Sequence, residues 1–205
     1  DSPGQVTAAY ARAFAARGGI LSTRQLNTLQ RNGEGWDVLD DSGQASYFEQ
    51  VVVALGPWSK QFMGRMGIRV PMAFERGYHM HYAPGAANGT SARLQRPVYD
   101  TGGAYVLSPM EQGLRLSTGV ELNDCEAAPN PVQLELAEAA ARQALPLGER
   151  LEAAPWMGRR PTLPDCRPII GAMPGRRNLW LAFGHQHVGF STGTGTAKLL
   201  GALMS

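Results

Sequence analysis

The sequence is poor in cysteine and has no long hydrophobic run. Its two cysteines, Cys125 and Cys166, stand far apart in a chain of 205 residues. This spacing excludes a disulfide framework and a zinc site built from cysteines. No stretch reaches about 18 consecutive apolar residues, so the sequence predicts no ordinary transmembrane helix. The cysteine usage fits a reducing compartment, and we expect a cytoplasmic protein.

Charge of either sign is also scarce. The chain has 19 basic and 17 acidic residues, a surplus of 19 − 17 = +2, and no basic block is visible. Nucleic acid is therefore not an expected partner. Hydrophobic residues make up 43% of the chain, enough to bury the core of one domain or of two small ones. Glycine and proline are abundant, at 25 and 14 residues, which excludes a plain helical bundle.

Several common functional signatures are missing. No Gly-x-Gly-x-x-Gly unit follows a first strand, no phosphate-binding loop is present, and no serine nucleophile elbow is visible. The chain starts at Asp1 rather than methionine and shows no signal-peptide pattern. We therefore expect either a processed protein or a fragment of a longer one.

The hydrophobic pattern predicts a mixed fold. Apolar residues recur at helical spacing over 3–17 and 131–144, and 197–204 is predicted as a terminal helix. The continuous apolar runs 51–55 and 179–183 are typical of strands buried on both faces of a sheet. Residues 98–120 predict an antiparallel meander, and the proline-dotted segment 155–168 is predicted to be irregular. The fold class is therefore α+β or α/β.

The end of the chain carries the most informative pattern. The strand 179–183 leads into the glycine- and hydroxyl-rich segment 184–196 and then into a helix. Free N–H groups and the dipole at a helix start favour partial negative charge. A ligand with an anionic or carbonyl oxygen would fit there. The alternative is a glycine-rich turn that only closes a strand–helix unit.

All four histidines fall in two His-x-His pairs, at 79/81 and 185/187. Paired imidazoles on one strand face can bind a transition metal. No carboxylate or cysteine stands at a supporting spacing, so we favour polar or pocket-lining histidines and expect no metal.

Two further side chains are of interest. Arg160 precedes Pro161 in a proline-rich segment, and an arginine on a stiff backbone suits a bidentate grip on a carboxylate. The alternative is an ordinary surface pair with Arg159. Tyr105 lies on a predicted strand, either with its hydroxyl available to a ligand or as a core residue.

Four segments carry a resemblance when taken together. Residues 51–59 end in A-x-G-x-W-S, and 75–78 read Glu-Arg-Gly-Tyr. Residues 156–171 follow W-x-G-x-R-P-x-x-P-D-x-x-P-x-I-G, and 178–195 follow N-L-x-x-x-x-G-H-x-x-x-G-x-x-x-x-x-G. In this order they resemble the carboxyl-terminal half of the FAD-dependent D-amino acid oxidase, dehydrogenase and glycine oxidase family. One departure is Cys166, where glycine is usual after the Pro-Asp pair.

This resemblance implies a domain organisation and a cofactor. It implies a partial FAD-binding domain made of residues 1–60 and 151–205, with an antiparallel-sheet substrate domain at 61–150. It also implies that the amino-terminal unit that binds the ADP part of FAD is missing from this chain.

The resemblance also implies site residues. Arg160 would pair with the substrate carboxylate, Tyr105 would help to hold it, and His187 would face the substrate. No side-chain base is implied, so no catalytic residue is assigned. The residues implied to lie along the flavin are Gly184, His185, Gln186, Val188, Gly189, Phe190, Ser191 and Thr192.

The implied activity is oxidative deamination or dehydrogenation of a D-amino acid or a related small amine carboxylate, by hydride transfer to FAD. A flavoenzyme acting on a 2-hydroxy acid or a secondary amine is one alternative. A non-catalytic fragment or binding module is another. The electron acceptor is either oxygen or a quinone, the latter placing the protein peripherally at a membrane.

We expect the 205-residue chain alone to bind FAD weakly or not at all. The affinity of such folds for FAD depends on a pyrophosphate cradle at an amino-terminal helix, which this sequence lacks. The visible absorbance spectrum of the chain, purified after incubation with FAD, measures the flavin retained. Retention of one flavin per chain would contradict this expectation.

Overall fold

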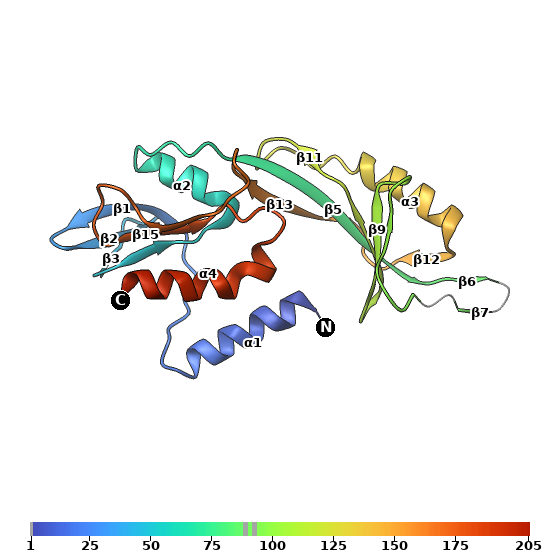
Figure 1. Cartoon of the computed structure of the whole chain (residues 1–205), viewed down its shortest axis with the longest axis horizontal. Helices are drawn as coiled ribbons and strands as arrows, with labels where there is room; N and C mark the ends of the chain where they lie inside the picture. Colours follow the sequence, from blue (N-terminus) through green and yellow to red (C-terminus); the bar gives the residue numbers. More distant parts are fainter. Residues whose placement is uncertain (1, 88–89, 92–93) are drawn as a thin grey trace. The chain divides into compact units, whose positions relative to one another are not determined.

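The structure, a computed structural model, describes residues 2–87, 90–91 and 94–205 (Figure 1). The chain divides into two compact units, which are described separately. Unit 1 comprises Asp1–Arg17 and Arg76–Arg159, and unit 2 comprises Gly18–Glu75 and Arg160–Ser205. The chain thus changes unit at 75/76 and 159/160, whereas the sequence placed the boundaries at 60/61 and 150/151. The first helix groups with unit 1. The assignment of flavin and substrate domains stays a prediction.

Unit 1 is built on an antiparallel sheet with the strand order β11-β5-β10-β9-β8, and β12 and β13 also pair with β5. The pairings of β8 with β9 and of β9 with β10 confirm the meander predicted over 98–120. The strands β5 and β13 continue into unit 2. The elements are α1 (Pro3–Ala15), β5 (Ala73–Pro84), β6 (Ala86–Ala87), β7 (Thr90–Ser91), β8 (Val98–Asp100), β9 (Tyr105–Met110), β10 (Gly113–Thr118), β11 (Glu121–Leu122), α3 (Val132–Ala144), β12 (Leu147–Arg150) and β13 (Trp156–Thr162).

The core of unit 1 lies between this sheet and α3 (Figure 1). Leu134, Ala137 and Ala141 recur at helical spacing and are all buried, so α3 presents one apolar face. Alternate residues of the strands supply the opposite side, because successive strand side chains point to opposite faces. They include Tyr78, Met80, Tyr82, Tyr105, Leu107, Leu114 and Leu116.

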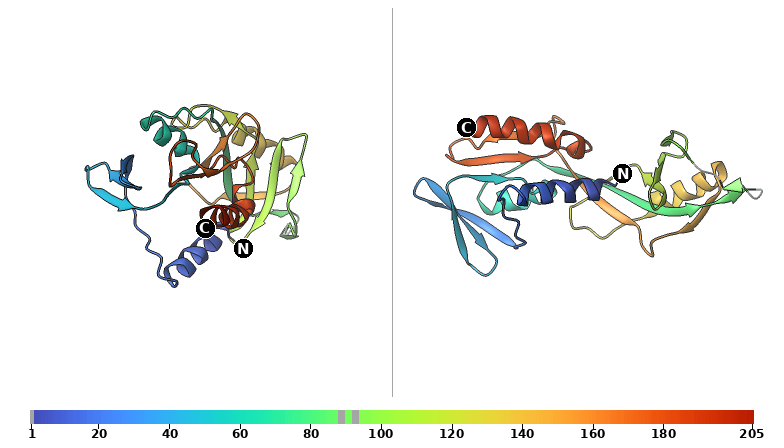
Figure 2. Two further views of the ribbon diagram at one scale, coloured as in Figure 1. Left: turned by 60° about the vertical axis from the view of Figure 1, so that its left-hand side comes forward. Right: turned by 90° about the horizontal axis from the view of Figure 1, so that it is seen from below.

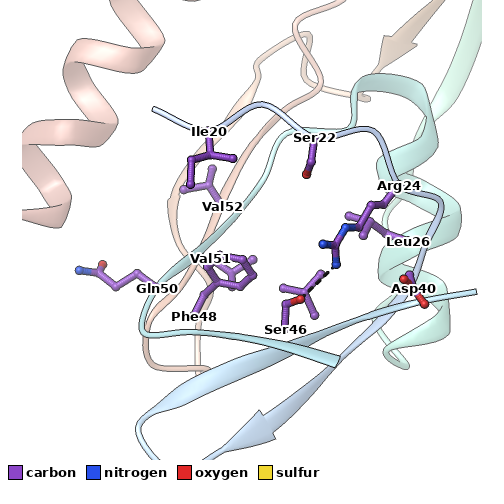
Figure 3. Close-up of a pocket in the computed structure, with 11 residues that line it drawn as sticks. Ile20, Ser22, Arg24, Leu26, Asp40, Ser46, Phe48, Gln50, Val51 and Val52 are labelled. Carbon is purple, nitrogen blue, oxygen red and sulfur yellow. Dashed lines mark hydrogen bonds between the residues drawn. The ribbon is translucent and has the colours of Figure 1, made fainter. Parts of the chain in front are cut away.

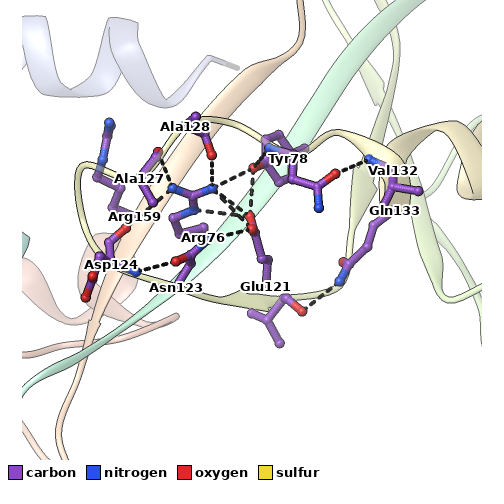
Figure 4. A network of polar contacts seen from close by, with 12 residues as sticks. Arg76, Tyr78, Glu121, Asn123, Asp124, Ala127, Ala128, Val132, Gln133 and Arg159 are labelled. Carbon is purple, nitrogen blue, oxygen red and sulfur yellow. Dashed lines mark hydrogen bonds and ion pairs between the residues drawn. The ribbon is translucent and has the colours of Figure 1, made fainter.

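A fully buried arginine holds the segment between β11 and α3 (Figure 4). The guanidinium of Arg76 donates to Glu121 Oε2 at 2.9 Å and to the carbonyl oxygens of Ala127 and Ala128 at 2.5 and 2.7 Å. The hydroxyl of Tyr78 donates to Glu121 at 2.7 Å and accepts a bond from the backbone of Asn130 at 2.8 Å. The start of α3 is therefore tied to β5 by polar contacts as well as by its apolar face.

Unit 2 contains two small sheets, ordered β1-β2-β3 and β14-β15-β4. β15 runs antiparallel to β14 and parallel to β4, with Leu179 opposite Val51 and Leu181 opposite Val53. Figure 2 shows α4 running beside the β14–β15 pair. The elements are β1 (Leu26–Asn32), β2 (Gly35–Asp40), β3 (Ala45–Phe48), β4 (Val51–Val53), a 3₁₀ turn (Gly56–Trp58), α2 (Ser59–Arg65), β14 (Ile169–Ala172), β15 (Leu179–Phe183) and α4 (Gly189–Met204).

The two apolar runs, 51–55 and 179–183, contain neighbouring strands of one sheet, as predicted. The prediction that both faces of the strand are buried is wrong for the run 51–55. Val53 is 2% exposed, whereas Val52 is 36% exposed. Val52 points to the face of β4 opposite Val53, and that face is partly open in the described part of the chain.

Two other expectations differ from the structure. Segment 155–168, predicted to be irregular, forms β13 up to Thr162 and pairs with β5. The proline within β13, Pro161, lacks a backbone N–H donor, and a strand tolerates this where that donor is not needed. The last helix, predicted from 197, begins at Gly189. No helix in the described ranges is both long and apolar enough to cross a membrane.

We expect Arg76→Met to destabilise the protein by about 3–5 kcal/mol, because it leaves the Glu121 carboxylate without its cation. The matched control is Arg177→Met, which breaks the 2.9 Å ion pair with Glu34 between side chains that are 76% and 73% exposed. Denaturant unfolding followed by circular dichroism measures both variants. Equal losses would contradict the role given to Arg76.

Candidate functional site

The turn between β15 and α4 has an unusual backbone. Gly184 has φ +87° and Gln186 has φ +51°, both in the left-handed region. A Cβ on Gly184 would lie 2.6 Å from Leu163 Cδ1, so glycine is required there by conformation and by space. The backbone N–H of Gln186 donates to the carbonyl of Pro161 at 3.2 Å. The turn is therefore tied to β13.

The start of α4 is suited to negative charge. Its N-cap residue, Val188, provides no side-chain hydrogen bond, and its first turn holds no acidic residue. The amide Nε2 of Gln186 is buried and finds no partner among the described residues. The helix N–H groups, the helix dipole and an unused amide donor would all favour an anionic or carbonyl oxygen. This donor set would suit the pyrimidine end of a flavin, and the contact of these residues with the flavin stays a prediction.

The two histidines of this turn have different partners. His185 Nε2 lies 2.9 Å from Thr196 Oγ1 of α4, and burial lowers the pKa of His185. His187 Nε2 donates to Glu75 Oε2, with the His187 side chain 50% exposed and that of Glu75 19% exposed. The sequence pair His185/His187 therefore does not act as one unit.

Arg159 and Arg160 are separated by the alternation of β13. Arg159 belongs to unit 1, where it donates to the carbonyl of Cys125 at 2.5 Å and lies 3.6 Å from Glu126. Arg160 belongs to unit 2, and its Nη1 is buried with no partner among the described residues. Burial lowers the pKa of Arg160, and the charge of Glu75 acts in the opposite direction. Arg160 is therefore the arginine with donor capacity to spare.

Tyr105 lies in unit 1. It is 2% exposed and belongs to the apolar core under α3. Burial raises the pKa of Tyr105, and a hydrogen bond to Asp100 raises it further. Its role towards a substrate carboxylate stays a prediction. The structure thus groups Arg160, His187 and the turn 184–192 within unit 2.

The other histidine pair lies on β5 in unit 1. His79 stacks on Trp156 with ring centroids 4.6 Å apart, and burial followed by the charge of Arg115 lowers the pKa of His79 to about 4. His81 Nδ1 lies 2.5 Å from Glu152 Oε1, and His81 Nε2 accepts a bond from Arg115 at 3.0 Å. Within the described ranges, no group of three or more histidine, cysteine and acidic side chains is placed to hold a metal ion.

Unit 2 also contains an open pocket with a volume of about 520 Å³ (Figure 3). Arg24 donates to Ser46 across it at 3.2 Å, and Asp40 is occupied by the backbone of its own turn. Its apolar lining includes Val52, on the open side of β4. None of the site residues implied by the sequence lines this pocket.

Sequence reasoning missed Glu75 as a site residue. Its partner His187 is 112 positions away, and no local spacing links the two residues. Sequence reasoning did single out Cys166, and the structure explains the usual glycine there. Cys166 has φ +58°, and its N–H donates to the carbonyl of Leu163 at 3.0 Å.

Almost the whole chain matches a family of flavin-dependent oxidoreductases. Residues 2–203 match the DAO family, described as FAD dependent oxidoreductase, and the chain belongs to this family. The cofactor of the family is FAD.

Two named relatives are similar to this chain in sequence. The chain is 30% identical over 208 residues to a D-amino-acid oxidase of Bradyrhizobium diazoefficiens, covering 99% of this chain and 48% of that protein. It is 32% identical over 158 residues to a D-amino acid dehydrogenase of Paramagnetospirillum magneticum, covering 77% and 36%. The chain thus spans about half of the first relative's length and 36% of the second's.

Solved structures show the same fold. Glycine oxidase from Geobacillus kaustophilus superposes with a TM-score of 0.75 at 23% identity, covering 96% of this chain and 52% of that one. L-proline dehydrogenase from P. horikoshii superposes with a TM-score of 0.78 at 17% identity, covering 99% and 55%.

We expect Gly184→Ala to lower the free energy of unfolding by more than about 1 kcal/mol, because a left-handed residue gains a Cβ that meets Leu163. Gly193→Ala is the matched control within α4. No described atom lies within 4 Å of its added Cβ, and alanine should stabilise the helix by roughly 0.5–1 kcal/mol. Denaturant unfolding of both variants is the measurement. Similar effects at the two positions would contradict the strained turn.

Proposed function

We propose that the protein oxidises a D-amino acid or a related small amine carboxylate with FAD as its cofactor. The observation that carries this proposal is the half-buried Arg160, whose Nη1 has no partner among the described residues. A buried guanidinium with unused donors is well suited to a carboxylate, since a charge-assisted bidentate pair satisfies both groups.

In this proposal the residues of the turn hold the cofactor and Arg160 orients the substrate. The N–H groups at the start of α4 and the amide of Gln186 would stabilise negative charge on the bound flavin. FAD supplies the acceptor for the hydride that leaves the substrate α-carbon. Arg160 fixes the carboxylate end of the substrate, which limits the orientations of that α-carbon.

The relatives support the amino-acid part of the proposal. The two named above are a D-amino-acid oxidase and a D-amino acid dehydrogenase. Because this chain spans only part of each, the stereochemistry and the activity of the whole protein belong to the proposal. A cytoplasmic location and the choice between oxygen and a quinone as electron acceptor stay predictions from the sequence.

Anaerobic mixing of the whole, FAD-loaded protein with one compound of each class tests the proposal. We expect D-alanine to bleach the visible absorbance of the flavin. Bleaching by D-lactate or sarcosine but not by D-alanine would favour the 2-hydroxy acid or secondary amine alternative. A protein that retains no flavin, or that no compound reduces, would favour a binding module.

We expect Arg160→Ala to raise KM steeply and to lower kcat, because both the grip and the alignment of the carboxylate are lost. A buried charge pair of this kind is worth about 2–5 kcal/mol, so kcat/KM should fall by roughly 30-fold or more. Arg160→Lys should recover only part of this loss, since a point charge cannot reproduce the planar fork. Steady-state kinetics with one amino acid substrate measure all variants.

The matched control is Arg159→Ala. Its guanidinium is held by the carbonyl of Cys125 and by Glu126, so kcat/KM should change little. If the control loses activity and Arg160→Ala does not, the carboxylate site has been assigned to the wrong arginine.

A further inference from the structure

Glu75 is an acidic residue within a site that would bind an acid. It is the third residue of β5, its side chain is only 19% exposed, and it accepts a hydrogen bond from His187. Its charge also acts on the half-buried guanidinium of Arg160. Glu75, Arg160 and His187 all belong to unit 2.

Two contacts hold the elements that carry Glu75, Arg160 and His187 next to one another. β5 pairs with β13, the strand that carries Arg160. The turn that carries His187 is tied to β13 by the bond from the Gln186 N–H to the Pro161 carbonyl at 3.2 Å. Three neighbouring elements therefore bring the carboxylate, the guanidinium and the imidazole together.

The charges of these groups limit what the site accepts. Arg160 and Glu75 cancel, so the three groups sum to zero with His187 neutral and to +1 with His187 protonated. Burial lowers the pKa of His185, in the same turn, and Lys198 of α4 is exposed to solvent. A substrate carboxylate bound by Arg160 occupies that guanidinium, so a second carboxylate would face the Glu75 charge without a further permanent cation among these groups, and like charges in a shared site repel.

We propose that Glu75 is a specificity-determining residue that restricts the carboxylate site to substrates with a single carboxylate and excludes dicarboxylates. This inference rests on the proposed function, because Arg160 is taken as the carboxylate anchor. Removal of the Glu75 charge raises the net charge of the site by one unit and makes room for a second anion. Exclusion by an opposing charge is a common route to specificity.

Calorimetric titration of the whole, FAD-loaded protein with acetate and with malonate tests this without turnover. We expect the wild-type protein to bind acetate more tightly than malonate. Glu75→Gln should shift the ratio of the two dissociation constants in favour of malonate by about tenfold or more. Glu75→Asp keeps the charge and should keep the wild-type preference. Glu34→Gln removes an exposed carboxylate of the same unit and should leave the ratio unchanged.

A merely structural role for Glu75 predicts a different result. Glu75→Gln would then weaken acetate and malonate by the same factor, and that outcome overturns the proposal. An unchanged ratio overturns it as well. If Glu75→Gln fails to fold, Glu75→Asp decides, because loss of the preference for acetate in that variant contradicts a charge effect.

Kinetics with D-alanine and D-aspartate separate this inference from the proposed function. If the protein oxidises D-alanine and Glu75→Gln leaves the ratio of the acetate and malonate dissociation constants unchanged, only the proposed selectivity is overturned. A Glu75-dependent ratio in a protein whose flavin no amino acid reduces would overturn the oxidation and support the selectivity.

Discussion

The guanidinium of Arg76 is fully buried, and a buried charge persists only where oxygen atoms surround it. Here a carboxylate, a phenol oxygen and three main-chain carbonyls do so. Burial alone would lower the pKa of Arg76, but its bonds to Glu121 and Tyr78 outweigh burial and raise that pKa. Because some of these oxygens belong to the segment between β11 and α3, their bonds to Arg76 fix the path of that segment. The apolar face of α3 is thereby held against the sheet.

The strand β5 carries both the buried Arg76 and polar side chains on its other face. Along β5 the even-numbered residues Arg76, Tyr78 and Met80 are buried and structural. The odd-numbered residues include Glu75 and His79, which point to the other face, as strand geometry requires. A shift of one residue in the register of β5 would exchange these sets. The buried arginine therefore also fixes which side chains of β5 are free for polar chemistry.

The sequence predicts helices and strands best where a hydrophobic pattern is compatible with only one of the two. The helical spacing of α3 and the apolar runs of β4 and β15 predict elements with a buried face, and these elements form as expected, although Val52 leaves the other face of β4 exposed. Local rules fail where tertiary pairing outweighs them. β13 contains Pro161 yet forms a strand against β5, and α4 extends through three glycines, Gly189, Gly193 and Gly195, that intrinsic propensity would exclude. The pair of Glu75 with His187 has no local signal, because only folding brings residues 112 positions apart into contact.

The left-handed backbone at Cys166 also has a practical consequence. The turn displays an exposed thiol in unit 2 on a backbone held by the Leu163 carbonyl. The second thiol differs, because burial and the neighbouring Glu126 raise the pKa of Cys125 to about 11 and keep it protonated. Thiolate, not thiol, attacks alkylating reagents. The chain therefore contains a natural attachment point for a single spectroscopic label, set three residues from Leu163, the side chain that lies against Gly184.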